Sequence, residues 1–95
     1  MYNDDITFEW DEDKRSTNLE KHGIDFLRAK EIWLGDILEI RSPQMHHGEE
    51  LFMAIGESNG QIITVIFTWR GRARRIISAR KARDYEEEDY QNEVR

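Results

Sequence analysis

The dipeptide Asn59-Gly60 constrains the fold of this chain more than any other feature, because it separates two apolar segments. Asn and Gly tolerate the positive φ angles that a two-residue β-hairpin turn requires. The flanking segments, 51–57 and 61–69, are rich in β-branched and aromatic residues. Within the second, the run from Ile62 to Phe67 is apolar at nearly every position, which indicates a central strand covered on both faces. The sequence therefore predicts an antiparallel hairpin in the middle of a sheet.

Further strands are predicted at 6–10, 37–41 and 74–79, with a loop around Pro43 between the second strand and the hairpin. Asp11 is a good N-cap for a helix that ends at His22, before Gly23. Asp25 caps a second helix, and a third covers 82–93. The order β-α-α-β-β-β-β-α predicts one α+β domain over residues 1–95, with a mainly antiparallel sheet of about four to five strands and helices packed on one face. The expected core includes Trp10, Phe26, Trp33, Ile66 and Ile77.

Half of the positive charge is concentrated in residues 70–83, which we call the basic strip. It contains seven of the fourteen Lys and Arg residues and no acidic residue, although the whole chain has a net charge of −6. A local cationic segment on an otherwise acidic chain favours contact with a polyanion at one place. It argues against a protein that coats nucleic acid over its whole surface.

Strict alternation along the predicted strand at 74–79 divides the arginines between the two faces of the sheet. One face should carry Arg74, Ile76, Ser78 and Arg80, and the other Arg75, Ile77 and Ala79. Guanidinium groups suit phosphate because they donate two hydrogen bonds and stay charged. We therefore expect Arg80→Ala to abolish activity while leaving the fold intact, and Arg83→Ala to be tolerated far better. The alternative is that these arginines pair with glutamates of neighbouring strands or of the acidic terminal helix.

The three histidines lie in two segments, and each segment is a candidate for acid–base chemistry or metal binding. Lys21-His22 closes the first helix, where His22 is either a general acid–base group or a simple helix-capping residue. His46-His47 are adjacent in the predicted loop, so their side chains should diverge, and no spaced set of ligands completes a site. We therefore predict no metal and no cofactor.

The composition and the apolar segments of the chain indicate its cellular compartment. The chain has no cysteine, which excludes disulfides and a thiolate nucleophile. Its first residues lack the pattern of a signal peptide, and Ile62–Phe67 is too short to span a bilayer. The sequence therefore predicts a cytoplasmic protein without membrane contact.

Several motifs, taken together, resemble the BrnT family, the toxins of BrnT/BrnA type II toxin–antitoxin pairs. The resemblance covers essentially the whole chain, and the most specific parts are the "N..KHG" helix end and the RIISAR segment. The matching residues are Phe8-Glu9-Trp10-Asp11, Lys14, Asn18, Lys21-His22-Gly23, the segment from Arg75 to Ala82, Glu86 and Tyr90.

The resemblance implies a RelE-like fold and a metal-independent endoribonuclease that inhibits translation. The ribose 2′-hydroxyl would attack the adjacent phosphate of an RNA substrate. By the same resemblance, Arg70, Arg75 and Arg80 bind phosphate, Lys21 and His22 are the acid–base candidates, and Glu9 and Glu86 are alternative bases. The implied partner is a DNA-binding, BrnA-like antitoxin, through which alone the toxin would reach operator DNA.

Two further hypotheses remain open at this point. The basic strip could dock a partner without cleavage, or the chain could be a degenerate toxin kept for antitoxin binding and autoregulation of its operon. Both are favoured by the acidic net charge of −6 and by Trp69, which stands where relatives often have a polar or acidic residue.

Overall fold

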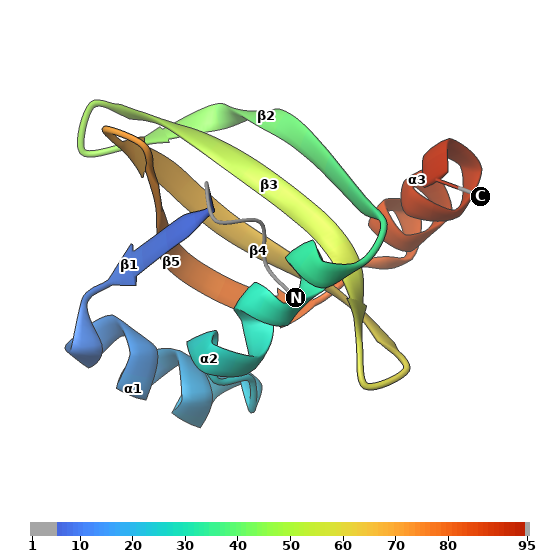
Figure 1. The fold of residues 1–95 in the computed structure, drawn as a ribbon, viewed down its shortest axis with the longest axis horizontal. Coiled ribbons are helices and arrows are strands. Elements are labelled where there is room, and N and C mark those ends of the chain that lie inside the picture. The colour runs from blue at the N-terminus through green and yellow to red at the C-terminus, as the bar shows by residue number, and fades with distance from the viewer. Residues whose placement is uncertain (1–5, 95) are drawn as a thin grey trace.

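The computed structural model describes residues 6–94, which form a five-stranded sheet and three α-helices (Figure 1). Along the sheet the strands lie in the order β1-β5-β4-β3-β2, with β1 parallel to β5 and every other pair antiparallel. The predicted α+β class and the predicted order of elements are confirmed. The elements are β1 (Thr7–Trp10), α1 (Glu12–His22), α2 (Phe26–Ala29), the 3-10 helix η1 (Lys30–Leu34), β2 (Ile37–His46), β3 (Glu49–Ser58), β4 (Gln61–Arg70), β5 (Ala73–Lys81) and α3 (Asp84–Val94).

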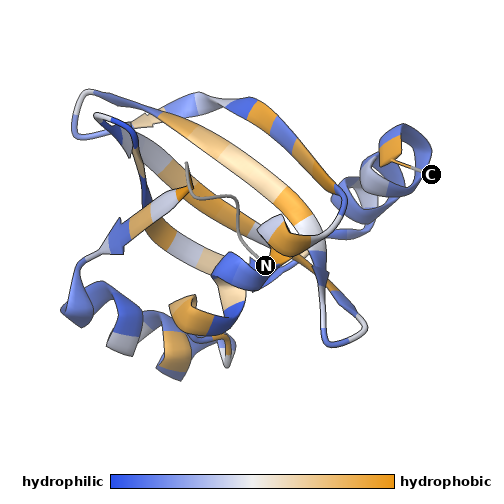
Figure 2. Ribbon diagram, viewed as in Figure 1, coloured by the Kyte–Doolittle hydropathy of each residue, from blue (hydrophilic) through white to orange (hydrophobic). Residues whose placement is uncertain are grey.

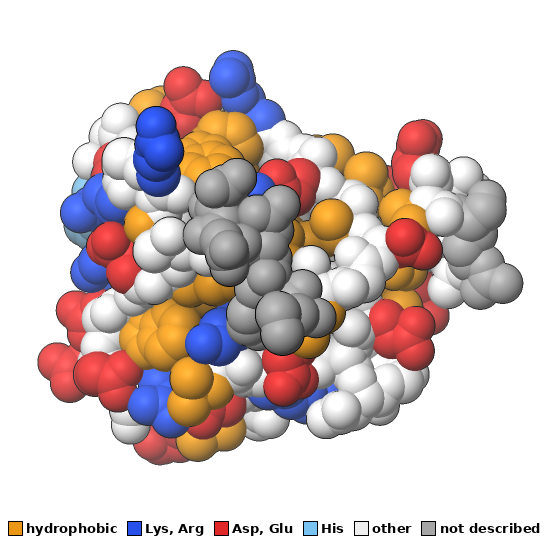
Figure 3. Space-filling model, viewed as in Figure 1, with side chains coloured by type: hydrophobic (Ala, Val, Ile, Leu, Met, Phe, Trp, Pro, Cys, Tyr) orange, Lys and Arg blue, Asp and Glu red, His pale blue; other side chains and the backbone are white. Residues whose placement is uncertain are grey.

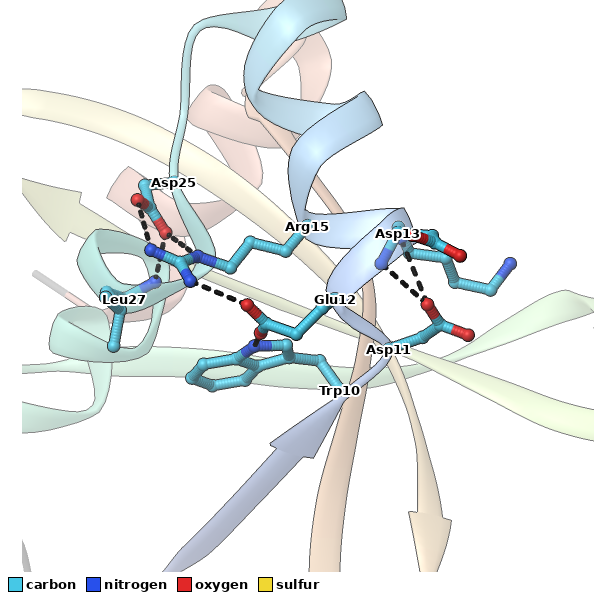
Figure 4. Close-up of polar contacts among 8 residues, drawn as sticks. Trp10, Asp11, Glu12, Asp13, Arg15, Asp25 and Leu27 are labelled. Carbon is cyan, nitrogen blue, oxygen red and sulfur yellow. Dashed lines mark hydrogen bonds and ion pairs between the residues drawn. The ribbon is translucent and has the colours of Figure 1, made fainter.

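The local signals that predicted the central hairpin and the first helix are confirmed. Asn59 and Gly60 have φ angles of 53° and 76°, as the two-residue turn between β3 and β4 requires. The Asp11 carboxylate accepts hydrogen bonds from the backbone N–H groups of Asp13 and Lys14 (Figure 4). At the other end of α1, Gly23 has a φ angle of 70°.

Asp25 starts α2 and also joins it to α1. Its carboxylate accepts a hydrogen bond from the backbone N–H of Leu27 at 2.9 Å and bonds from the Arg15 guanidinium at 2.8 and 3.1 Å (Figure 4). The Arg15 hydrogen bonds, followed by the Leu27 N–H, hold the pKa of Asp25 below its ordinary value. The predicted second helix tightens into η1 after Ala29.

The core lies between one face of the sheet and the layer formed by α1, α2 and η1. Apolar residues dominate the middle of β3 and β4, whereas α1 is largely hydrophilic (Figure 2). Phe26 and Trp33 are buried, as predicted, and Trp10 packs at the margin of the core. Ile66 and Ile77 were expected in the core and are only partly buried, so that prediction is wrong. The buried core comprises Ile24, Phe26, Ala29, Ile32, Trp33, Ala54, Ile63, Val65, Phe67, Ile76 and Ala79.

A β-bulge in β5 explains why the alternation was misread. Ile66 pairs with Ser78, but the next residue of β4, Phe67, pairs with Ile76, so Ile77 is an extra residue. Ile76 and Ala79 therefore both face the core. On the opposite side of the sheet the same bulge puts Arg75, Ser78 and Arg80 on one face, because they pair with the alternating residues Thr68, Ile66 and Thr64 of β4. Arg74 remains on the core side, apart from Arg80.

Strand β2 is longer than predicted. The chain stays extended past Pro43 to His46, and its pairing with β3 is irregular between Arg41 and Met45. Proline is tolerated there because β2 is an edge strand. The turn that follows uses positive φ angles at His47 and Gly48.

Helix α3 departs from the expectation that all helices pack on one face. Its Glu86 carboxylate accepts a hydrogen bond from Thr64, whose side chain points away from the core, and the Tyr90 hydroxyl donates to the Asp36 carbonyl at 3.0 Å. In Figure 1, α3 lies at the end of the sheet away from α1 and α2. Among residues 6–94, no helix is long and apolar enough to cross a bilayer.

Gly56 marks the closest approach of η1 to the sheet. A Cβ atom at this position would lie 2.8 Å from the Cβ of Ile32. We expect Gly56→Ala to lower the free energy of unfolding by about 1–3 kcal/mol, because the helix must shift to relieve the overlap. Urea unfolding measures the effect. Gly35→Ala is the matched control, since a Cβ there meets no atom within 4 Å, and equal stability of the two variants would contradict this packing.

Candidate functional site

The sheet face opposite the core carries both polar and apolar side chains, and the start of α3 covers part of it at Thr64; we call it the open face. It is built by Thr64, Ile66 and Thr68 of β4 and by Arg75, Ser78 and Arg80 of β5. Two grooves of about 360 and 440 Å³ lie on the two sides of this face. Ser78 lines the first and Ile66 lines the second, and these two residues are cross-strand partners. The grooves therefore adjoin across the middle of the sheet.

The first groove lies between α1 and β5 and contains two of the predicted site residues. Lys21 and His22 line it together with Asp13, Lys14, Thr17, Asn18, Ile77 and Ser78. Both Lys21 and His22 are exposed and belong to the last turn of α1. A cation there is favoured by the helix dipole.

Asn18 fixes the position of this groove. Its buried carboxamide donates to the carbonyls of Ala79 and Ile24, both at 2.9 Å, and accepts from the Ala79 N–H at 3.0 Å. Strand β1 pairs with β5 only as far as Ile76. The Asn18 side chain thus satisfies the backbone of Ala79 where the edge strand has ended. This anchor holds the C-terminal turn of α1, with Lys21 and His22, against the bulge.

The second groove lies between β2 and the start of α3, with Arg80 in its wall. The Arg80 guanidinium donates to both carboxylate oxygens of Glu86, at 2.7 and 2.9 Å. Glu86 is only 1% exposed and also accepts bonds from the Arg83 N–H and the Thr64 hydroxyl. Burial raises the pKa of Glu86, but these hydrogen bonds and the charge of Arg80 outweigh it and lower the pKa to about 2. The expectation that Arg80 does nothing for the fold is therefore wrong, because its charge stabilises a buried carboxylate.

Arg70 and Arg75 form a cluster on the open face, at the end of the sheet that carries the β2–β3 and β4–β5 turns. Arg70 binds both oxygens of Glu49, at 2.9 and 3.0 Å, and Arg75 binds Glu9 at 2.6 Å. The hydrogen bond from Arg70 is the largest influence that lowers the pKa of Glu49, and the charge of Arg75 adds to it. Glu9 in turn contributes to the raised pKa of Arg70. The two ion pairs are thus close enough to act on each other.

His46 lies next to this cluster, although its sequence context suggested only a loop residue that binds no metal. It is the partly buried last residue of β2 and pairs with Glu49. Burial, the neighbouring His47 and the charge of Lys14 lower its pKa from the ordinary value of 6.5. Lys14 of α1 is thus close enough for its charge to act on His46. The sequence signal that could have identified this hairpin is Gly48, which lies between two strand-like segments. A glycine in that position is typical of a hairpin turn rather than a long loop.

The other members of the basic strip lie elsewhere. Arg74 packs on the core side, with its guanidinium 4.5 Å from the ring of Trp69 and hydrogen-bonded to Glu39 at 3.0 Å. In Figure 3, Lys and Arg side chains are spread among acidic ones over the part of the molecule away from α3, and acidic side chains lie beside α3. The structure therefore brings Arg70 and Arg75 together, puts Lys21 and His22 in the adjoining first groove, and separates Arg80 from both.

A sheet with one face covered by α1, α2 and η1, with arginines on the other face and a groove lined by Lys21 and His22 beside it, defines a small α+β protein equipped to bind an anionic ligand. The family model described as the ribonuclease toxin BrnT of type II toxin–antitoxin systems matches residues 10–86. The chain belongs to this family, as its motifs indicated. It is accordingly a ribonuclease toxin whose partner is a protein antitoxin. No curated protein gives a significant match to the chain.

Proposed function

We propose that this toxin is an endoribonuclease that cleaves RNA on its open face without a metal ion and thereby inhibits translation. In this reaction the ribose 2′-oxygen attacks the adjacent phosphorus, the bond to the 5′-oxygen breaks, and the products carry a cyclic phosphate and a 5′-hydroxyl. The observation that carries the proposal is the register of β4 and β5, which puts Arg70 and Arg75 on the same face as Ser78, a residue that lines the groove with Lys21 and His22.

Arg70 and Arg75 would bind the scissile phosphate and stabilise the charge that develops on its oxygens. Their present partners, Glu49 and Glu9, have side chains that are 34% and 40% exposed. Ion pairs this open contribute little to stability. A phosphate, like a carboxylate, offers two oxygens to a bidentate guanidinium fork, so RNA can replace these partners. Lys21 and His22 are the proposed acid–base groups, with Glu9 as an alternative base.

Arg80 and Glu86 take a supporting role in this proposal. The bidentate Arg80–Glu86 pair is almost fully buried on the carboxylate side, with side-chain exposures of 18% and 1%. RNA could reach that guanidinium only by leaving Glu86 charged and unpaired, which is costly. Arg80 therefore adds positive potential to the second groove and fixes the start of α3. For the same reason Glu86, with its pKa lowered to about 2, is a poor general base.

The proposed partner is a DNA-binding, BrnA-like antitoxin that covers the open face. A toxin with a net charge of −6 repels DNA over most of its surface. Contact with operator DNA is therefore proposed to run through the antitoxin alone.

The alternative is a binding module without catalysis, and one observation favours it. Each of Arg70, Arg75 and Arg80 is already paired with a carboxylate in the protein. A degenerate toxin that only binds its antitoxin and takes part in autoregulation would have the same surface.

Cleavage in EDTA separates the two functions. We expect the purified toxin, freed of its antitoxin, to cut single-stranded RNA at the same rate with EDTA as with Mg²⁺. The donor set supports this expectation, since no three His, Cys, Asp or Glu side chains among residues 6–94 are grouped to hold a metal. Electrophoresis of an end-labelled RNA gives the rate. Activity that is lost in EDTA and restored by Mg²⁺ or Mn²⁺ would contradict the mechanism, and no cleavage in either buffer would favour the binding module.

A further inference from the structure

We propose that His46 is the general base of the ribonuclease reaction, an inference that rests on the proposed function and identifies the group that removes the proton from the 2′-hydroxyl. The base must lie next to the residues that bind the scissile phosphate, because the 2′-oxygen attacks that phosphorus. His46 pairs with Glu49 across the β2–β3 hairpin, and Glu49 is held by both nitrogen donors of the Arg70 fork.

His46 ends the edge strand β2, and its cross-strand partner Glu49 binds Arg70, so it lies at the border of the open face next to Arg70. It feels the positive charge of Lys14 from α1 and the negative charge of Glu49 from β3. Glu49 in turn feels Arg75 from β5. Lys14 of α1 and Glu49 of β3 thus act on this imidazole directly, whereas Arg70 and Arg75 act on its partner Glu49. The other described histidines differ: His47 is exposed in the turn, and His22 is exposed at the end of α1.

The imidazole of His46 is also available for proton transfer. The imidazole ring packs against the ring of His47 in an edge-on arrangement, with 4.1 Å between the ring centroids. Neither ring nitrogen donates or accepts a hydrogen bond within residues 6–94. Burial and the nearby positive groups favour the neutral ring, so at pH 7 a lone pair is free to accept a proton.

The reaction balances with His46 in this role. Its nitrogen takes the proton of the 2′-hydroxyl as the 2′-oxygen forms a bond to phosphorus. The bond between phosphorus and the 5′-oxygen breaks, and the leaving oxygen takes a proton from the acid of the first groove, for which Lys21 and His22 remain the candidates. Arg70 and Arg75 hold the phosphate oxygens, while Lys14 disfavours protonation of the base before the attack.

The test is the pH dependence of kcat/KM on a short single-stranded RNA in EDTA, for the wild-type chain, His46→Gln and His47→Gln. The wild-type rate should rise with pH to a plateau, with a midpoint below about 6.5, because the neutral ring is the active form. His46→Gln should lose about 10²- to 10⁴-fold in kcat with KM changed less than about threefold, and should lose the acidic limb. His47→Gln should keep both the rate and the limb.

A second variant distinguishes loss of the base from distortion of the β2–β3 hairpin. His46→Ala should regain part of its activity when imidazole is added, which a purely structural loss would not show. The proposal is overturned if His46→Gln keeps the rate and the acidic limb, if imidazole restores nothing, or if His47→Gln loses as much as His46→Gln. A wild-type chain that cleaves no RNA would overturn the proposed function, and this inference with it.

Discussion

Replacing Arg80 by Ala is expected to lower the free energy of unfolding by roughly 3–5 kcal/mol, because it leaves the buried Glu86 carboxylate without its cation. The two hydrogen bonds that are lost are 2.7 and 2.9 Å long, and Glu86 is 1% exposed. A loss of this size approaches the whole stability of many small domains. Arg83→Ala is the matched control, since the Arg83 side chain is exposed and its 3.5 Å contact with Tyr85 is weak. It should cost less than about 1 kcal/mol.

Urea unfolding of both variants measures this difference, and a third variant isolates its cause. Adding Glu86→Gln to Arg80→Ala should restore much of the stability, because the buried charge is then absent. In the folded wild type the pKa of Glu86 is about 2, below its unfolded value of about 4.3. This depressed pKa contributes stability above about pH 4.3 that is lost as the pH falls towards 2, and Glu86→Gln should lack that loss. If Arg80→Ala is as stable as Arg83→Ala, the buried ion pair is not what fixes α3.

The second large effect is on catalysis. Arg75→Gln is expected to reduce the rate of RNA cleavage by about 10²- to 10³-fold, the usual cost of removing one donor to the transition-state charge. Its stability should change by less than about 1 kcal/mol, since Arg75 and Glu9 form a partly exposed pair. Arg74→Gln removes the same charge from the neighbouring position, but on the core side of the sheet. It should keep cleavage activity, although it loses contacts with Trp69 and Glu39.

Cleavage of a labelled RNA, with circular dichroism to confirm folding, compares the two variants. Equal losses from Arg75→Gln and Arg74→Gln would mean that net charge matters and position does not. That outcome would favour diffuse electrostatic binding of RNA over a positioned phosphate site.

Much of the fold could be predicted because its signals are local. The Asn59-Gly60 turn, the Asp11 cap and the Gly23 helix end each depend on a few adjacent residues whose backbone preferences are strong. All three are found where they were predicted. The arrangement of the site depends instead on one extra residue, Ile77, which shifts the alternation of β5. A bulge of this kind leaves no mark in a pattern of alternating residues, so Arg75 was assigned to the wrong face.

The roles of Arg80 and His46 could not be predicted for a related reason. Whether an arginine binds a ligand or a glutamate depends on which carboxylate the tertiary fold brings to it. Glu86 is six residues away in sequence and reaches Arg80 because α3 begins over Thr64. His46 was assigned to a loop because Pro43 precedes it, although an edge strand accommodates that proline. The sequence could identify the candidate groups, but only the register of the sheet shows which of them meet.

The chemical ends of the RNA products test the central claim most directly. The reaction is the EDTA cleavage assay, with each product analysed by mass spectrometry and by its susceptibility to polynucleotide kinase. We predict 2′,3′-cyclic phosphate on the upstream fragment and a free 5′-hydroxyl on the downstream one, with both products reduced to background in Arg75→Gln and retained in Arg74→Gln. Fragments that carry a 3′-hydroxyl and a 5′-phosphate would show that water, rather than the 2′-hydroxyl, attacks the phosphorus, and would contradict the mechanism.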